Sequence, residues 1–206
     1  KLVLKCLNNK LKDYLKNDII EITVEKYLEN DNKWKSHWGI FRNIVHFEDK
    51  ETDIDPYLYG LCISAINNNE QSTSEILDFY KSKKNITSEE EKYYYDKLNT
   101  LLLSNVSSIC STYKINSLQK RLELLAGIID YESILNKELK SYDLLINSLS
   151  LTNDICFLAR SCGFTVNKRE TAKIHLNNFI NKFRISIFGD IKVIPCRNEN
   201  HINLNF

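Results

Sequence analysis

The sequence has no methionine and only two prolines and five glycines among its 206 residues. Because proline and glycine most often interrupt helices and strands, their scarcity favours long regular elements, with helices dominant. The chain opens on Lys1 with an apolar alternation and no start signal. We therefore expect an internal piece of a longer polypeptide, long enough for one full domain and a smaller appendage.

No apolar run approaches the roughly 18 to 20 residues that a membrane-spanning helix needs, and no signal-peptide pattern is present. These absences argue against a membrane span. They predict a soluble intracellular protein, located in the cytoplasm or the nucleus according to the protein that carries it.

The six cysteines form no CxxC pair and have no histidine at ligand spacing, so the sequence predicts neither a zinc site nor a disulfide framework. Buried reduced thiols are the expected state. The cysteines are Cys6, Cys62, Cys110, Cys156, Cys162 and Cys196.

The net charge of +1 does not indicate a partner, but its distribution is uneven. From Cys156 to Arg197 there are eight basic and two acidic residues, a local balance of 8 − 2 = +6. Such a segment could hold a phosphate backbone. The basic residues are Arg160, Lys168, Arg169, Lys173, Lys182, Arg184, Lys192 and Arg197.

The first fifty residues predict a small strand-rich unit, with alternating strands at 1–6, 18–24 and 41–47. A short helix or turn over 25–38 carries Trp34 and Trp38, whose rings could stack bases or pack as one helix face. The acidic segment "EDKETDIDP" then predicts a linker, with a domain boundary near residue 52. Pro56 suits the first turn of the next helix.

Beyond the linker the pattern is helical, and after Ser117 it becomes mixed. "TSEE", from Thr87 to Glu90, predicts a capping box, and Gly163 suits the end of a helix. The predicted helices cover 57–66, 74–83, 88–103, 118–136 and 151–162. The predicted strands are "SYDLLIN", "FTVNK" and "FRISIF", the last two separated by a loop over 172–181.

One stretch, "RLELLAGIIDYES", combines features of a helix that packs closely on another backbone. Residues Leu124 to Ile129 are apolar almost all the way round, and Ala126 and Gly127 are adjacent small residues. Glycine costs about 1 kcal/mol relative to alanine in a helix, a loss that makes sense where another helix must approach. Two carboxylates, Asp130 and Glu132, follow at its end. By itself the stretch is also compatible with an ordinary core helix.

The surrounding blocks make a resemblance specific. "YKINSLQKRLELLAGIIDYES", "LTNDICFLARSCGF" and "KFRISIFGDIKVIPC" resemble, in this order, the second half of the LAGLIDADG homing endonucleases carried by inteins of fungal and viral type. Upstream, "DIIEITVEKYLENDNKWKSHWGIFRNIVHF" and "IDPYLYGLC" resemble the region that joins the first splicing segment to the endonuclease. The resemblance is weakest between Asn67 and Tyr113.

This resemblance implies two pseudo-symmetric halves, each led by a LAGLIDADG helix, whose sheets form a saddle on double-stranded DNA. One carboxylate from each helix would hold Mg²⁺ beside the scissile phosphates. Glu132 would be the catalytic metal ligand of the second helix, with Asp130 as the earlier metal-site Asp. Lys182 would be the lysine near the metal, or else a solvated surface lysine. The implied DNA contacts are Arg160, Lys168, Arg169, Lys173, Arg184 and Lys192, although Arg160 could equally anchor helix to sheet.

The first LAGLIDADG helix should be "LYGLCISAI", in which Gly60 matches the family glycine. Ala65 falls where its catalytic carboxylate belongs, and no Asp or Glu occurs between Leu58 and Asn69. The first half is therefore expected to be eroded and mostly helical. The implied helix-pair contacts are Gly60, Ser64, Ala126 and Gly127.

The sequence thus predicts an α+β fold with a β-rich splicing-domain flank at 1–52, a degenerate first half at 53–118 and a second half at 119–206. The expected form is a monomer with internal pseudo-symmetry, inserted in a host protein. Because no splicing nucleophile, TxxH block or terminal His-Asn pair is visible, the fragment should not splice by itself. Three functions remain open: a degenerate insert without catalysis, an active Mg²⁺-dependent endonuclease, and a helical interaction module whose two glycine-bearing helices would not meet.

Overall fold

The computed structural model describes residues 2–40, 44–68, 72–104, 106–175 and 178–188, apart from the side chains of Ile40, Glu132, 172–175 and 178–181. The chain divides into two compact units, Lys1–Asn43 and Ile44–Phe206. Within the described residues it is a mixed α+β protein with eight helices and two antiparallel sheets. None of the described helices is both long and apolar enough to cross a membrane.

The first unit is a three-stranded sheet with two short helices. Strands β1 (Leu2–Cys6), β2 (Ile19–Ile22) and β3 (Trp38–Ile40) pair in the order β2-β1-β3, and α1 (Val24–Glu29) and α2 (Asn32–Lys35) connect β2 to β3. The side chains of Thr23 and Asp31 cap the two helices.

The tryptophans of this unit pack together, with Trp34 and Trp38 ring centroids 5.2 Å apart. The expectation of a shared helix face is wrong in detail, because Trp38 lies in β3 and is buried. The strand expected at 41–47 is also wrong where it can be judged, since residues 44–47 pair with no strand; residues 41–43 lie outside the described chain.

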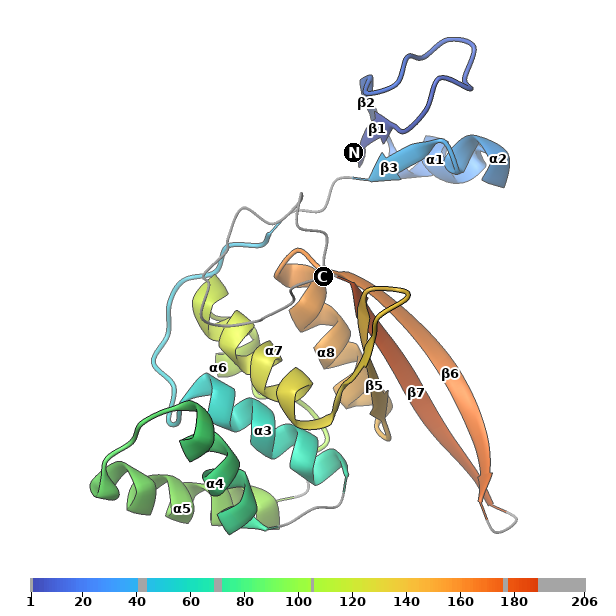
Figure 1. Cartoon of the computed structure of the whole chain (residues 1–206). Helices are drawn as coiled ribbons and strands as arrows, with labels where there is room; N and C mark the ends of the chain where they lie inside the picture. Colours follow the sequence, from blue (N-terminus) through green and yellow to red (C-terminus); the bar gives the residue numbers. More distant parts are fainter. Residues whose placement is uncertain (1, 41–43, 69–71, 105, 176–177, 189–206) are drawn as a thin grey trace. The chain divides into compact units, whose positions relative to one another are not determined.

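The second unit contains six helices and a four-stranded sheet (Figure 1). The helices are α3 (Pro56–Asn67), α4 (Thr73–Lys83), α5 (Ser88–Leu103), α6 (Ser111–Lys114), α7 (Leu118–Glu132) and α8 (Leu149–Ser161). The local signals act as expected. Asp55 caps α3 with Pro56 in its first turn, Thr87 and Glu90 form the capping box of α5, and Gly163 follows α8 with a φ of 93°.

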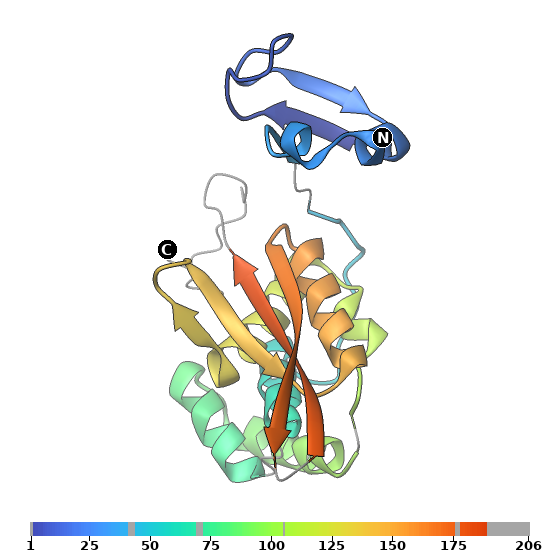
Figure 2. The ribbon, with the colours of Figure 1, turned by 90° about the vertical axis from the view of Figure 1, so that its right-hand side faces the viewer.

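The sheet of the second unit pairs β4 (Ile134–Asn136), β5 (Ser141–Ile146), β6 (Thr165–His175) and β7 (Asn178–Phe188) in the order β4-β5-β7-β6, all antiparallel. Helix α8 packs on one face of it, and Figure 2 shows the strands in front of the helices. Two expectations fail here. The helix expected to reach residue 136 ends at Glu132, and the loop expected over 172–181 is mostly strand.

Two apolar clusters meet at α3, which is buried along almost its whole length. One cluster joins α7, α8 and the inner face of the sheet, and the other joins α3 to α4 and α5. No strand occurs among the described residues between α3 and α7. This part of the unit is helical, as the polar pattern of 67–113 predicts.

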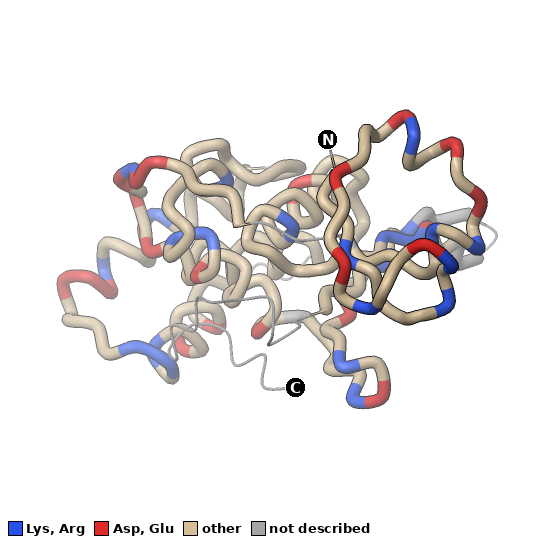
Figure 3. The backbone as a smooth tube through the Cα atoms, turned by 90° about the horizontal axis from the view of Figure 1, so that it is seen from above, with Lys and Arg blue, Asp and Glu red and all other residues tan. Residues whose placement is uncertain are grey.

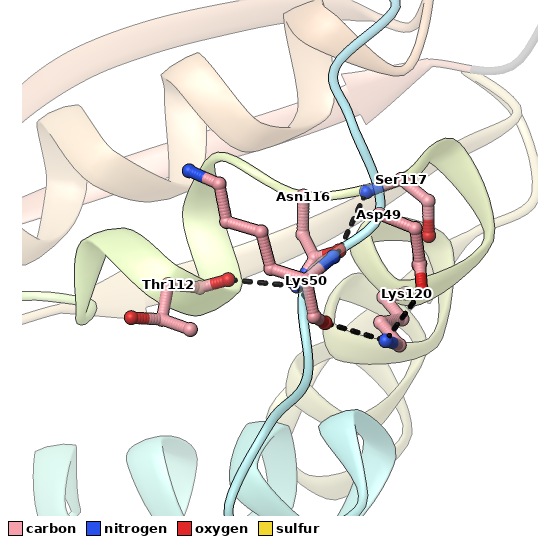
Figure 4. A network of polar contacts seen from close by, with 6 residues as sticks. All are labelled: Asp49, Lys50, Thr112, Asn116, Ser117 and Lys120. Carbon is pink, nitrogen blue, oxygen red and sulfur yellow. Dashed lines mark hydrogen bonds and ion pairs between the residues drawn. The ribbon is translucent and has the colours of Figure 1, made fainter.

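Residues 44–55, which we call the strap, belong to the second unit, so the division of the chain falls earlier than the boundary expected near residue 52. Asn116 holds the strap by using its whole amide group (Figure 4). Its Oδ1 accepts from the backbone nitrogens of Lys50 and Ser117, and its Nδ2 donates to the carbonyls of Lys50 and Thr112. Every hydrogen-bonding position of a buried amide is therefore satisfied.

Arg121 of α7 fixes the beginning of the strap. Its side chain is fully buried and donates to the carbonyls of Val45 and Asn116 and to the Ser161 hydroxyl. Its guanidinium carbon lies 4.9 Å from the centroid of the Phe47 ring. Burial lowers the pKa of Arg121, but arginine stays charged at any pH at which proteins fold. The strap thus supplies partners for the buried guanidinium of Arg121.

Candidate nucleic-acid interface

Helices α3 and α7 lie side by side and run in the same direction (Figure 1), with their backbones in contact at two glycines. A methyl group on Gly60 would overlap the carbonyl oxygen of Leu124 and lie 2.9 Å from the nitrogen of Ile128. A methyl group on Gly127 would overlap the carbonyl oxygen of Tyr57 and lie 3.0 Å from the nitrogen of Leu61. No residue with a Cβ fits at either position without moving backbone.

The two contacts are reciprocal. Leu124 precedes Gly127 by three residues, as Tyr57 precedes Gly60, and Ile128 and Leu61 each follow their glycine directly. Exchanging the two helices therefore reproduces these two glycine contacts.

The other two residues expected in the helix pair are also buried beside it. The Ser64 hydroxyl donates to the carbonyl of Ile128 at 3.0 Å, so a side chain of α3 bonds to the backbone of α7. Ala126 is buried and packs in the cluster that joins α3 to α4 and α5.

The expected carboxylates lie in different surroundings. Asp130 is exposed at the end of α7, and its Oδ2 accepts a hydrogen bond of 2.8 Å from the Tyr57 hydroxyl of α3. Burial, followed by the bond to Asp130, raises the pKa of Tyr57 above its usual range. Glu132 belongs to the last turn of α7, but its side chain lies outside the described part of the structure.

Ala65, the position at which the resemblance expects the first catalytic carboxylate, is completely buried. It packs among apolar side chains of α3, α4 and α5, including Leu61, Ile76 and Leu98. Asn67 cannot act as a substitute ligand there, because its Oδ1 accepts from the backbone nitrogen of Asn147 and its Nδ2 donates to the carbonyl of Leu145. Helices α4 and α5 thus occupy the surroundings of the missing ligand.

The described side chains include no assembled Mg²⁺ site of the kind that the resemblance implies. Such a site needs several oxygen ligands that converge on one point. No group of three or more potential ligand side chains occurs among the side chains that the structure describes. Asp130 is the one expected carboxylate that can be placed, and it is bonded to Tyr57. No catalytic step through a metal follows from these residues.

The sheet face opposite α8, which we call the outer face, is polar. Strand register alternates the side chains, so Phe183, Ile185 and Ile187 of β7 point inward and are buried, whereas their neighbours point outward. Besides the apolar Ile134, Leu145 and Phe188, the outer face carries Asn136, Ser141, Asp143, Thr165, Asn167, Arg169, Thr171, Lys182, Arg184 and Ser186.

Two expected nucleic-acid contacts, Arg169 and Arg184, meet on this outer face with Lys182, the lysine expected near the metal. Arg169 of β6 lies directly opposite Arg184 of β7 in the strand register, and Lys182 lies one pair further along, opposite Thr171. The two arginines are exposed, and Lys182 is half-buried. Like charges directly opposite each other destabilise a sheet, so this arrangement suits a surface that binds an anion.

One acidic residue of the outer face was not singled out from the sequence. Asp143 of β5 is buried, and its Oδ2 accepts from Arg184 at 2.7 Å. The signal was present in "SYDLLIN", where the strand alternation puts this carboxylate on the polar side.

Two other expected contacts lie on the α8 side of the sheet. Arg160 donates to the carbonyl of Val166 at 3.1 Å, which matches the alternative of a helix–sheet anchor, and Lys168 donates to Asn153 of α8 at 2.9 Å. Both line a shallow groove together with Phe157. The strand register places Lys168 on the opposite face from Arg169, and Arg160 belongs to α8, so the expected set does not form one surface.

The remaining expected contacts cannot be assigned to either surface. Lys173 belongs to β6 without a described side chain, and Lys192 lies outside the described residues. Along the described backbone, basic and acidic residues are interspersed and not gathered into one block (Figure 3).

No protein-family profile matches this chain, and no curated protein matches it.

Proposed function

We propose that the second unit is a LAGLIDADG-type domain that binds double-stranded DNA through the outer face of its sheet and does not cleave it. The observation that carries this proposal is the outer face itself, where Arg169, Arg184 and Lys182 stand among short hydroxyl and amide side chains. Cations that bind phosphates and polar groups that hydrogen-bond to bases are the two components of a DNA-reading surface. An antiparallel pair of strands can enter the major groove.

The reciprocal contact of Gly60 and Gly127 supports descent from a paired-helix architecture. A helical interaction module with an accidental likeness gives no reason for two backbones to meet at equivalent residues. The proposed ancestral activity is site-specific double-strand cleavage with Mg²⁺.

The proposed loss of cleavage follows from the residues of the expected first half. Ala65 offers no ligand and is enclosed by α4 and α5, and no strand follows α3 in the described residues before α7. A single remaining carboxylate cannot organise two metal ions, so the rate should fall by several orders of magnitude.

The path of the chain supports an inserted domain, as in an intein within a host protein. Ile44, where the second unit begins, packs against Gly163, and Phe188, its last described residue, pairs with Thr165. The first and last described residues of this unit therefore lie beside the same turn.

Binding of the full chain to duplex DNA at low salt, measured by fluorescence anisotropy, tests the proposal. The double variant Arg169→Glu, Lys182→Glu should bind at least about tenfold more weakly, and its salt dependence should be shallower. The matched control, Arg160→Glu with Lys168→Glu, changes the charge equally on the α8 side and should bind as the wild type does. No binding by the wild type, or an equal loss in both variants, would overturn the proposal.

Cleavage is tested separately with plasmid carrying the uninterrupted host gene and Mg²⁺. We expect no linear product. Robust cutting would show that the domain is an active endonuclease and would refute the loss of catalysis.

A further inference from the structure

Arg184 differs from the other cations of the outer face in how it is held. Its Nη2 donates to Asp143 Oδ2 at 2.7 Å, while half of the Arg184 side chain remains exposed. Asp143 is itself restricted by burial, since its side chain is only 7% exposed; its Oδ1 also has a long contact of 3.5 Å with the Ser141 hydroxyl. A buried carboxylate on β5 therefore orients an exposed guanidinium on β7.

This arrangement affects recognition because an unrestrained arginine side chain loses rotamer entropy when it binds a ligand. Asp143 restricts Arg184 before any ligand arrives, so a contact by the remaining donors costs less entropy and is geometrically more selective. The guanidinium has five N–H donors in a fixed plane, and Asp143 engages only one edge of it.

Arg169 and Lys182 do not share this restraint. Neither side chain has a hydrogen bond or ion pair among those of the described residues, although Arg169 lies directly opposite Arg184. A free cation serves well as a phosphate contact, because a phosphate is met from many directions. Among the described residues, the outer face thus contains one oriented donor group, Arg184, beside two cations without a described partner.

The shape of the sheet gives Arg184 a suitable place. Strand β5 pairs with β7 only from Phe183 to Phe188, whereas β6 continues along β7 to Asn178. Arg184 pairs with Leu145 of β5 and Arg169 of β6, in the three-stranded part of the sheet, one pair before β5 ends and only the two-stranded ribbon of β6 and β7 continues. A ribbon of this kind fits the major groove of DNA, where guanine presents its O6 and N7 acceptors.

We propose that Arg184, oriented by Asp143, reads a guanine in the major groove and determines sequence preference, whereas Arg169 and Lys182 contact phosphates. This assignment rests on the proposed function, that the outer face binds double-stranded DNA. Asp143 is a positioning residue that acts through Arg184.

The experiment measures how the full chain selects from duplexes randomised over the site, with affinities of single-position variants of the preferred sequence. The wild type should prefer guanine at one position by about tenfold or more. Arg184→Lys should lose that preference, since a lysine cannot reproduce the planar bidentate geometry. Arg169→Ala should weaken binding to all sequences and keep the preference.

The variant Asp143→Asn separates the orientation of Arg184 by Asp143 from the effect of the Asp143 charge on DNA binding. Because it removes a negative charge near the DNA, overall affinity should rise or stay equal, while the preference for guanine at that same position falls. A rise in affinity with unchanged preference would overturn the positioning role. Circular dichroism of each variant establishes that it is folded.

The outcomes separate this inference from the function on which it rests. If the wild type does not bind duplex DNA, both are wrong. If it binds but Arg184→Lys keeps the guanine preference, or no guanine is preferred, DNA binding stands and the assignment of Arg184 is overturned.

Discussion

At the scale of single residues, Gly60 and Gly127 matter most because each faces backbone and not the tip of a side chain. A side chain can rotate away from a new methyl group, but a carbonyl inside a helix can move only with its helix. The cost of a Cβ here is therefore that of separating α3 from α7.

Gly127→Ala should lower the free energy of unfolding of the second unit by about 3 kcal/mol, despite the better helix propensity of alanine. Chemical denaturation followed by far-ultraviolet circular dichroism measures the loss. Gly39→Ala is the control, because the nearest atom to its new methyl group is the Cδ2 tip of Leu7. It should leave the second unit unchanged. Equal stability of Gly127→Ala and the wild type would contradict the backbone contact.

Ala65 gives a second prediction at this scale. Replacing it with glutamate would restore the missing carboxylate in sequence, but the position is enclosed by apolar side chains. Burial of an unpaired carboxylate costs several kcal/mol, so Ala65→Glu should unfold at least part of the unit and yield no DNA cleavage. The control is Leu103→Glu, since Leu103 is 88% exposed and should tolerate the change. A stable, cutting Ala65→Glu variant would refute this account of the lost site.

At the scale of elements, the strap is a structural part of the second unit. Without it, Arg121 loses its acceptor at Val45 and the stacking of Phe47, and Asn116 loses its partner Lys50. A buried charge or amide left without its partner costs more than the bond itself contributes.

A chain that begins at Ile44 should therefore be as stable as the second unit of the full chain, whereas one that begins at Asp53 should be about 3 kcal/mol less stable. For a domain of this size, the midpoint of thermal unfolding should fall by roughly 10 °C. Thermal scans of both chains check this. Equal midpoints of thermal unfolding would mean that the strap does not stabilise the second unit.

Elements with strong local signals could be predicted from the sequence. Pro56 with Asp55, the Thr87–Glu90 box and Gly163 fix helix ends through bonds within a few residues, and α3, α5 and α8 lie close to their expected positions. The glycines of α3 and α7 predicted a close helix contact, which is present. In each case the structure is determined by a bond between residues close in sequence or by an unusual local composition.

The elements that were missed depend on distant pairing. Residues 134–136 continue a helical pattern, but they end as β4 because β5 offers them a partner strand. The stretch 172–181 is polar and resembles a loop, yet its backbone pairs along β6 and β7. Most of the strap was assigned to the first unit and to a linker, because its anchors, Asn116 and Arg121, lie about seventy residues away in sequence.

For the candidate site, the sequence could predict which residue types are present, but not how the strands arrange them. Strand alternation could place Arg169 and Arg184 on polar faces, but only the register shows that they lie opposite each other and that Lys168 faces α8. The pairing of Arg184 with Asp143 joins strands that are not neighbours in sequence. The enclosure of Ala65 by α4 and α5 is likewise a tertiary feature.

At the scale of the whole molecule, the two units can be observed separately. Both tryptophans lie in the first unit, so tryptophan fluorescence follows that unit. Most helical residues lie in the second unit, so far-ultraviolet circular dichroism follows mainly the second.

Alkaline pH should unfold the second unit through its buried thiols and phenols. Burial raises the pKa of Cys62 to about 12, that of Cys162 to about 11 and that of Tyr113 to about 12. In the unfolded chain these groups ionise near their ordinary values, of about 8.5 for cysteine and about 10 for tyrosine. The unfolded state therefore releases protons first, and stability, complete below about pH 8.5, should fall as pH rises toward 12. Denaturant titrations at pH 7, 9 and 10.5 measure this, and an unchanged midpoint would contradict it.

The closeness of Ile44 and Phe188, the first and last described residues of the second unit, to one turn has a practical consequence. A domain whose two ends lie close together can be inserted into a surface loop of an unrelated protein without separating the ends of that loop. Because Ile44 contacts Gly163 and Phe188 pairs with Thr165, the described segment 44–188 has its two ends near one turn, which favours its insertion into such a loop.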